Sequence, residues 1–179
     1  MSFLPKNIVT LTTYILRRKN GNRQLQSDLT QLFSSLTMAT KIVSNALERA
    51  GIEKLFGCSD LINNEGEQVP KLDVLANEAF RSSLSACGLV CAMCSESDED
   101  VLLLESAEEK KYVVCFDPLD GSCNLDASVT VGTIFGIYER KSRGSQRNYK
   151  KKLPQTYKIV QLANFLFKKI TLEKCSCEK

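Results

Sequence analysis

The hydrophobic periodicity of the chain changes from helical to strand-like part-way along the sequence, and this change constrains the fold more than any other feature. Residues 29–50 repeat apolar side chains every three or four positions, which predicts a long amphipathic helix. Residues 71–88 predict a second helix. Short apolar or β-branched runs then predict strands at 89–93, 101–105, 112–116 and 128–138. Helices followed by strands predict an α+β fold, a layered α/β sandwich with a mixed sheet.

Weaker patterns surround these elements. Residues 7–18 place apolar side chains at helical spacing and predict a short first helix. Asp28 followed by Gln31 is the pattern of a capping box, which predicts that the long helix begins at Asp28. Residues 61–70 are polar and predict a mobile loop, whereas residues 157–170 show a spacing that predicts an amphipathic helix.

Composition indicates a globular chain, since 43% of the residues are hydrophobic and 25% are charged. We expect a cytoplasmic protein without a membrane span, because we find neither a long apolar run nor a signal peptide. Residues 139–179 hold 12 of the 24 basic residues and 3 of the 21 acidic ones. Such a tail can bind nucleic acid or an anionic membrane, but it contains no recognisable binding module. We therefore predict a folded domain at 1–138 and a basic, divergent, poorly ordered tail at 139–179, with neither nucleic acid nor membrane as a partner.

The chain has eight cysteines and no histidine. In the expected cytoplasmic setting, free thiols are favoured over disulfides. Cys91 and Cys94 form a C-x-x-C pair, but no second pair follows at a suitable spacing, so buried strand cysteines are favoured over a zinc site. Without histidine, any general acid or base must be an Asp, Glu, Lys, Tyr or Cys side chain.

The segment CFDPLDGSCN, residues 115–124, places two carboxylates at the end of an apolar run. Asp117 and Asp120 flank a proline that stiffens the turn, and the Leu119 carbonyl lies between them in sequence. Two carboxylates and a carbonyl are hard oxygen ligands that suit Mg²⁺ or Mn²⁺. The alternative is an Asx-turn, in which the aspartates only cap a bend. The spacing alone leaves both interpretations open.

The residues that follow can complete a phosphate site. Gly121 permits a tight turn. The amides of Gly121, Ser122 and Cys123 can form an anion-binding nest, with the Ser122 hydroxyl as a further donor. A divalent cation beside a phosphate-binding turn is typical of enzymes that catalyse phosphoryl transfer.

Two acidic residues elsewhere are candidates for the same site. Glu96 follows the predicted strand 89–93, and it would lie beside Asp117 if this strand neighbours 112–116. The alternative for Glu96 is a solvated acidic loop. Asp73 stands at the start of a predicted helix, where the alternative role is a favourable charge at the helix N-terminus.

The stretches KYVVCFDPLDGSCNLD and VGTIFGIY together resemble the class 1 fructose-1,6-bisphosphatase family, which comprises magnesium-dependent sugar phosphatases of gluconeogenesis. The likeness runs from about residue 8 to residue 138, which is the N-terminal half of a family member. It implies an incomplete sugar-phosphatase N-terminal domain, fructose 1,6-bisphosphate as the substrate, Mg²⁺ or Mn²⁺ as the cofactor, and assembly as a homo-oligomer.

The resemblance also implies roles for single residues. Asp73 would help to activate water, and Asn63 would lie on a loop that closes over the site. The implied metal ligands are Glu96, Asp117, Asp120 and the carbonyl of Leu119. The implied 1-phosphate site is Asp120, Gly121, Ser122 and Cys123. The implied site for the inhibitor AMP is Gln26, Ser27, Asp28, Leu29, Thr30, Lys111 and Tyr112.

The chain departs from the family pattern at several of these places. Ser97 stands where a second glutamate is usual, and Cys123 where a serine is usual. Gln26 and Ser27 replace a Thr-Gly pair, and Glu139 replaces an arginine, which predicts impaired AMP inhibition. The family's second half carries another metal-binding glutamate and the residues that hold the 6-phosphate and the sugar.

We therefore expect little or no turnover by this chain. The alternative function is that of a non-catalytic fragment that associates with full-length subunits. A basic tail that binds nucleic acid is a second alternative.

Overall fold

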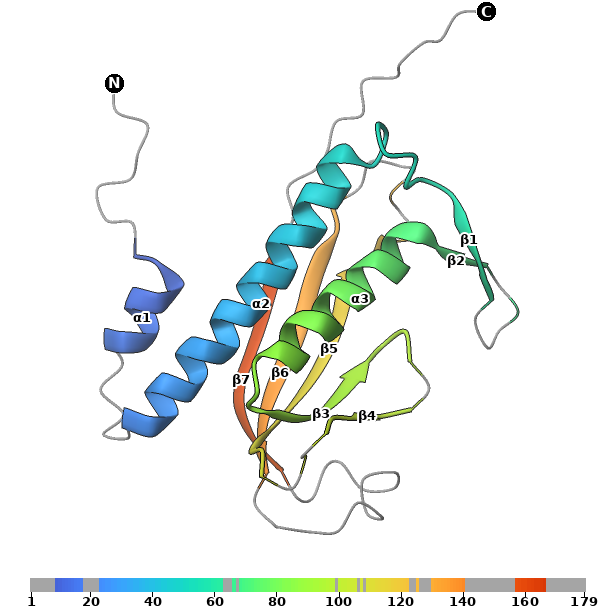
Figure 1. Cartoon of the computed structure of the whole chain (residues 1–179). Helices are drawn as coiled ribbons and strands as arrows, with labels where there is room; N and C mark the ends of the chain where they lie inside the picture. Colours follow the sequence, from blue (N-terminus) through green and yellow to red (C-terminus); the bar gives the residue numbers. More distant parts are fainter. Residues whose placement is uncertain are drawn as a thin grey trace, which may run out of the picture.

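The computed structural model places its helices in the first half of the chain (Figure 1). The helices are α1 (Leu11–Arg17), α2 (Arg23–Arg49) and α3 (Lys71–Ala86). Figure 1 shows α2 and α3 side by side across one face of a sheet. The structure describes residues 9–17, 23–62, 66, 68–98, 100–105, 107, 109–122, 125, 130–140 and 157–166.

The described part of the main sheet has five strands in the order β4-β3-β5-β6-β7. β3 (Val90–Ser95) and β5 (Tyr112–Asp120) are parallel, and the other neighbours are antiparallel. The remaining strands of this sheet are β4 (Leu102–Leu103), β6 (Gly132–Arg140) and β7 (Tyr157–Leu166). A separate antiparallel pair is formed by β1 (Cys58–Ile62) and β2 (Gln68–Pro70).

The main core lies between the two long helices and the sheet. α2 buries the apolar stripe that its periodicity predicts, including Leu32, Leu36 and Val43. α3 adds Phe80, whose ring stacks on Phe116 of β5 with centroids 5.2 Å apart. Each such side chain contributes roughly 1.5–3 kcal/mol when it is buried. These contacts fix α3 above the parallel strand pair.

The prediction that α2 begins at an Asp28 cap is wrong, because the helix begins five residues earlier, at Arg23. Asp28 lies inside the helix and is 3% exposed. Its carboxylate accepts hydrogen bonds from Gln24, one turn earlier, and from Tyr112 of β5. A partner on a distant strand, rather than the helix terminus, explains the acidic residue here.

Other predicted elements also differ from the structure. Residues 61–70 were expected to be a loop, and their ends instead belong to β1 and β2. The helix expected at 157–170 is wrong, because residues 157–166 form β7 and pair along β6. Glu139 and Arg140, at the start of the predicted tail, lie in β6. The mixed α+β fold class is confirmed, and the domain division at residue 138 stays a prediction.

The described cysteines are free thiols: Cys58, Cys87, Cys91, Cys94 and Cys115. Cys91 is buried in β3, where its thiol donates to the Tyr112 carbonyl at 3.1 Å. Among the described helices, none is long and apolar enough to cross a membrane.

Candidate active site

The parallel pairing of β3 and β5 brings two acidic residues to one edge of the sheet. Ser95 pairs with Phe116, so Glu96 and Asp117 are the next residues on the two neighbouring strands. The Glu96 amide donates to the Phe116 carbonyl at 3.0 Å, which holds the Glu96 backbone against β5. The predicted neighbourhood of Glu96 and Asp117 is therefore present.

A β-bulge at Pro118 and Leu119 shapes the turn between the two aspartates. Asp117 pairs with Ile134 and Asp120 with Gly132, so β5 holds one more residue than β6 over this stretch. Proline has no amide hydrogen for the ladder, which favours a bulge at this position. The Pro118 carbonyl instead accepts a hydrogen bond from the buried Thr133 hydroxyl at 2.8 Å.

The Asx-turn alternative describes part of this turn correctly. The Leu119 amide donates to Oδ1 of Asp117 at 3.1 Å, so this aspartate does cap the bend. The bond uses one oxygen of the carboxylate, and a capping role does not exclude a ligand role for the other oxygen. Gly121 has a φ of 84°, a left-handed conformation that favours glycine and turns the chain toward Ser122.

Asp73 joins α3 to this turn. The Ser122 hydroxyl donates to Oδ2 of Asp73 at 2.8 Å across 49 residues of sequence. Burial raises the pKa of Asp73, the Ser122 hydrogen bond lowers it, and the charges of Asp117 and Glu96 raise it further. Asp73 therefore belongs to the acidic site, in addition to its place in the first turn of the helix.

Burial also raises the pKa of Asp117, against the lowering effect of the Leu119 amide, and the charges of Glu96 and Asp120 add to the rise. Asp73, Glu96, Asp117 and Asp120 thus form one electrostatically coupled set. A divalent cation would relieve this mutual repulsion, and the hard oxygen donors suit Mg²⁺ or Mn²⁺. The donor chemistry fits such a cation, although within the described ranges no three acidic or cysteine side chains converge as a ready ligand set.

Two predicted site residues, Asn63 and Cys123, lie outside the described residues. Sequence reasoning missed Thr133 and the bond between Ser122 and Asp73. It also missed Asn77 and Arg81, which bind Asp98 just beyond Glu96. The only available signal was that Asp73, Asn77 and Arg81 follow one another at intervals of four, which places them along one side of a helix.

The comparison with protein families decides the identity of this fold. The family model described as "Fructose-1-6-bisphosphatase, N-terminal domain" matches residues 9–167, which is most of the chain. The chain belongs to the fructose-1,6-bisphosphatase family. The match runs beyond residue 138 and takes in β7.

Relatives in this family include a cytosolic fructose-1,6-bisphosphatase of Oryza sativa subsp. indica, which is 43% identical over 137 residues. "Fructose-1,6-bisphosphatase 1" of Bos taurus is 44% identical over the same length. Each alignment covers 76% of this chain and 40% of the relative, so the chain spans about 40% of the length of these proteins.

Among solved structures, the holo form of Leishmania major fructose-1,6-bisphosphatase matches with a TM-score of 0.67 and 33% identity. The match covers 79% of this chain and 42% of that structure.

The residues expected to bind AMP in this family divide into a cluster around the buried Asp28 carboxylate and a helix segment. Asp28 accepts from the Tyr112 hydroxyl at 2.9 Å and from Gln24 at 2.7 Å, and the Lys111 ammonium lies 3.5 Å from it. Burial and the bond to Asp28 raise the pKa of Tyr112. The other predicted residues, Gln26, Ser27, Leu29 and Thr30, lie in the first two turns of α2, where the Thr30 hydroxyl donates to the Gln26 carbonyl.

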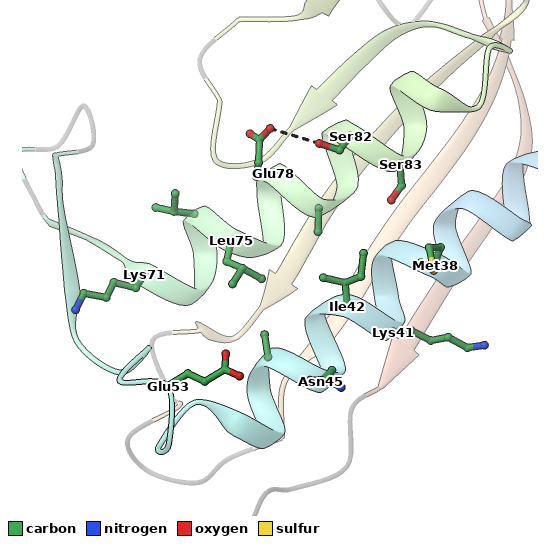
Figure 2. A pocket seen from close by; sticks show the side chains of 13 residues that line it. Met38, Lys41, Ile42, Asn45, Glu53, Lys71, Leu75, Glu78, Ser82 and Ser83 are labelled. Atoms are coloured by element: carbon green, nitrogen blue, oxygen red, sulfur yellow. Dashed lines mark hydrogen bonds between the residues drawn. The ribbon is translucent and has the colours of Figure 1, made fainter.

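A groove of about 850 Å³ lies between α2 and α3, away from the acidic site (Figure 2). Met38 and Ile42 of α2 and Leu75 and Ser83 of α3 are among the residues that line it. None of the four coupled carboxylates lines this groove. The groove is therefore an apolar surface separate from the acidic site.

Proposed function

We propose that the described domain carries the catalytic half-site of a metal-dependent phosphatase that removes the 1-phosphate of fructose 1,6-bisphosphate. The observation that carries this proposal is the placement of four carboxylates at one end of the sheet: Asp73 of α3 is bonded to Ser122, Glu96 follows β3 beside Asp117, and Asp117 and Asp120 lie in β5. The names of the relatives support the choice of substrate. The metal ligands would be Glu96, Asp117, Asp120 and the Leu119 carbonyl.

A bound Mg²⁺ or Mn²⁺ would neutralise phosphate oxygens and lower the pKa of water. The chain's own groups would bind the phosphate and accept the proton. The amides of Gly121, Ser122 and Cys123 would hold the 1-phosphate, with Asp120 at the start of the same segment. Asp73 would accept a proton from the attacking water, and the family resemblance implies a further role for Asn63. A raised pKa makes Asp73 a better proton acceptor than an ordinary aspartate.

The bond between Ser122 and Asp73 sets a condition on this mechanism. The Ser122 hydroxyl has one proton, which it donates to Asp73 in this structure. It cannot donate the same proton to a phosphate oxygen. If the Ser122 hydroxyl donates to a phosphate oxygen instead, Asp73 loses a hydrogen bond that lowers its pKa and becomes more basic. Phosphate binding would therefore prepare Asp73 to accept a proton.

The test is Mn²⁺ binding and phosphate release by the unaltered chain. We expect Mn²⁺ binding that E96Q and D120N abolish, with little or no phosphate release, because Ser97 stands where the family pattern has a second glutamate. D60N, which neutralises an exposed acid in β1, is the matched control and should bind Mn²⁺ normally.

Absence of Mn²⁺ binding would overturn the metal site. Phosphate release at rates normal for the family would overturn the expectation of low turnover. Co-purification of this chain with a full-length family member, with no phosphate release by the chain itself, would favour the alternative of a non-catalytic chain that associates with longer subunits.

We also propose that AMP binds this chain weakly. The Asp28 carboxylate places negative charge beside Lys111 and Tyr112, which would repel a nucleotide phosphate. A titration with AMP should give a dissociation constant that falls in D28N. A cytoplasmic location and a homo-oligomeric assembly are likewise proposals, supported by the names of cytosolic relatives and by the resemblance to the family.

A further inference from the structure

The turn that follows β3 is held at two points, the backbone of Glu96 and the residue Asp98. At one end the Glu96 amide donates to the Phe116 carbonyl of β5 at 3.0 Å. At the other end the Asp98 amide donates to the Ser95 carbonyl at 3.2 Å, and the Asp98 carboxylate binds α3. The Glu96 side chain itself is exposed, so packing alone does not fix its position.

The contacts of Asp98 with α3 are polar and largely protected from solvent. Oδ1 of Asp98 accepts from Nδ2 of Asn77 at 3.2 Å and forms an ion pair with Nη2 of Arg81. The Asp98 side chain is 16% exposed. A charge-assisted bond of this kind is stronger than an ordinary surface ion pair.

Asn77 and Arg81 continue a line of polar residues that starts at Asp73. We name these three residues the α3 polar stripe, because intervals of four place them one turn apart on the same side of the helix. Asp73 binds Ser122 of the phosphate turn, whereas Asn77 and Arg81 bind the turn that carries Glu96. One helix therefore contacts both loops of the acidic site.

We propose that Arg81 and Asn77 are positioning residues, which act through Asp98 to hold Glu96 beside Asp73 and Asp117. This inference rests on the proposed metal site. Nothing in the sequence pattern that resembles the family assigns a role to Arg81, Asn77 or Asp98. Partners that orient a metal ligand in this way typically change metal affinity by 10–100-fold when they are removed.

The test measures Mn²⁺ affinity of the full chain, by titration calorimetry or by the electron paramagnetic resonance signal of free Mn²⁺. R81Q separates a positioning role from a purely electrostatic one. Loss of a positive charge near the site would by itself make cation binding tighter. Loss of the bond that holds Asp98 would make it weaker, and we expect the affinity of R81Q to fall about tenfold.

Three further variants complete the design. R81K keeps the charge and should recover part of the lost affinity, although lysine lacks the planar fork of arginine. N77A changes no charge and should also weaken Mn²⁺ binding, which keeps the proposal testable if R81Q is unstable. R49Q breaks the exposed ion pair between Arg49 and Glu53 and should leave Mn²⁺ affinity unchanged. Far-UV circular dichroism and thermal unfolding report whether each variant is folded.

The outcomes distinguish this inference from the proposed function. If the unaltered chain binds no Mn²⁺, both fail. If E96Q loses Mn²⁺ binding but R81Q binds as tightly as the unaltered chain or more tightly, the metal site stands and the positioning role is overturned. Weaker binding in folded R81Q and N77A, with R49Q unchanged, supports the positioning role.

Discussion

The bond from the Tyr112 hydroxyl to the Asp28 carboxylate links the helical layer to the central strand, and its removal has a calculable effect. Y112F keeps the buried ring and removes only the hydroxyl, which lies 2.9 Å from a carboxylate that is itself 3% exposed. A hydrogen bond to a charged group contributes about 1.5–3 kcal/mol. Because Gln24 and Lys111 still contact Asp28, we expect Y112F to lower the free energy of unfolding by about 2 kcal/mol.

Urea unfolding followed by circular dichroism measures this loss. With a denaturant slope of about 2 kcal/mol per molar urea, the midpoint should fall by about 1 M while the slope stays unchanged. Y14F is the matched control, because Tyr14 is 54% exposed and the midpoint should not move. A double-mutant cycle of Y112F with D28N should show a coupling energy of about 1 kcal/mol. A midpoint shift below about 0.2 M for Y112F, or no coupling to Asp28, would refute the reasoning.

Two further predictions concern the acidic site. Because the folded-state pKa of Asp117 is raised, its ionisation destabilises the fold as the pH rises through that pKa, and protonation at low pH removes the penalty. D117N should therefore raise the thermal midpoint slightly at pH 7 in EDTA. It should leave the midpoint unchanged below about pH 3, where an ordinary aspartate is also mostly protonated. A lower midpoint at pH 7 would contradict this. S122A removes the hydrogen bond that lowers the pKa of Asp73, so the carbon-13 carboxyl titration of Asp73 should shift to higher pH, with D73N identifying the resonance; an unchanged titration would mean that this bond is absent in solution.

The parts of the fold that follow from local patterns could be predicted from the sequence. The stripe of α2 has a helical period over most of its length, and its buried apolar residues are those that the period selects. Glu96 and Asp117 could be placed together because each follows a predicted strand, and the structure shows that β3 and β5 are parallel neighbours. The family resemblance is confirmed by the match to residues 9–167.

The errors arose where a distant partner decides the local structure. Aspartate is a residue type that often caps helices, which favoured a helix start at Asp28. Its partner Tyr112 is 84 residues away, and α2 extends to both sides of Asp28. Residues 157–166 have apolar spacing that suits a helix, but β6 offers them a strand edge along its length. The bond between Asp73 and Ser122 spans 49 residues and leaves no signal in either local segment.

The α3 polar stripe gives one rigid element control over two separate loops. A rotation or tilt of this helix would displace the Ser122 turn and the Asp98 turn together, since each is attached to it by side-chain bonds. Phosphate and cation binding would then respond jointly to any contact made on the outer surface of the helix. The groove beside Leu75 and Ala79 lies on that surface, so α3 connects the groove to both turns of the acidic site.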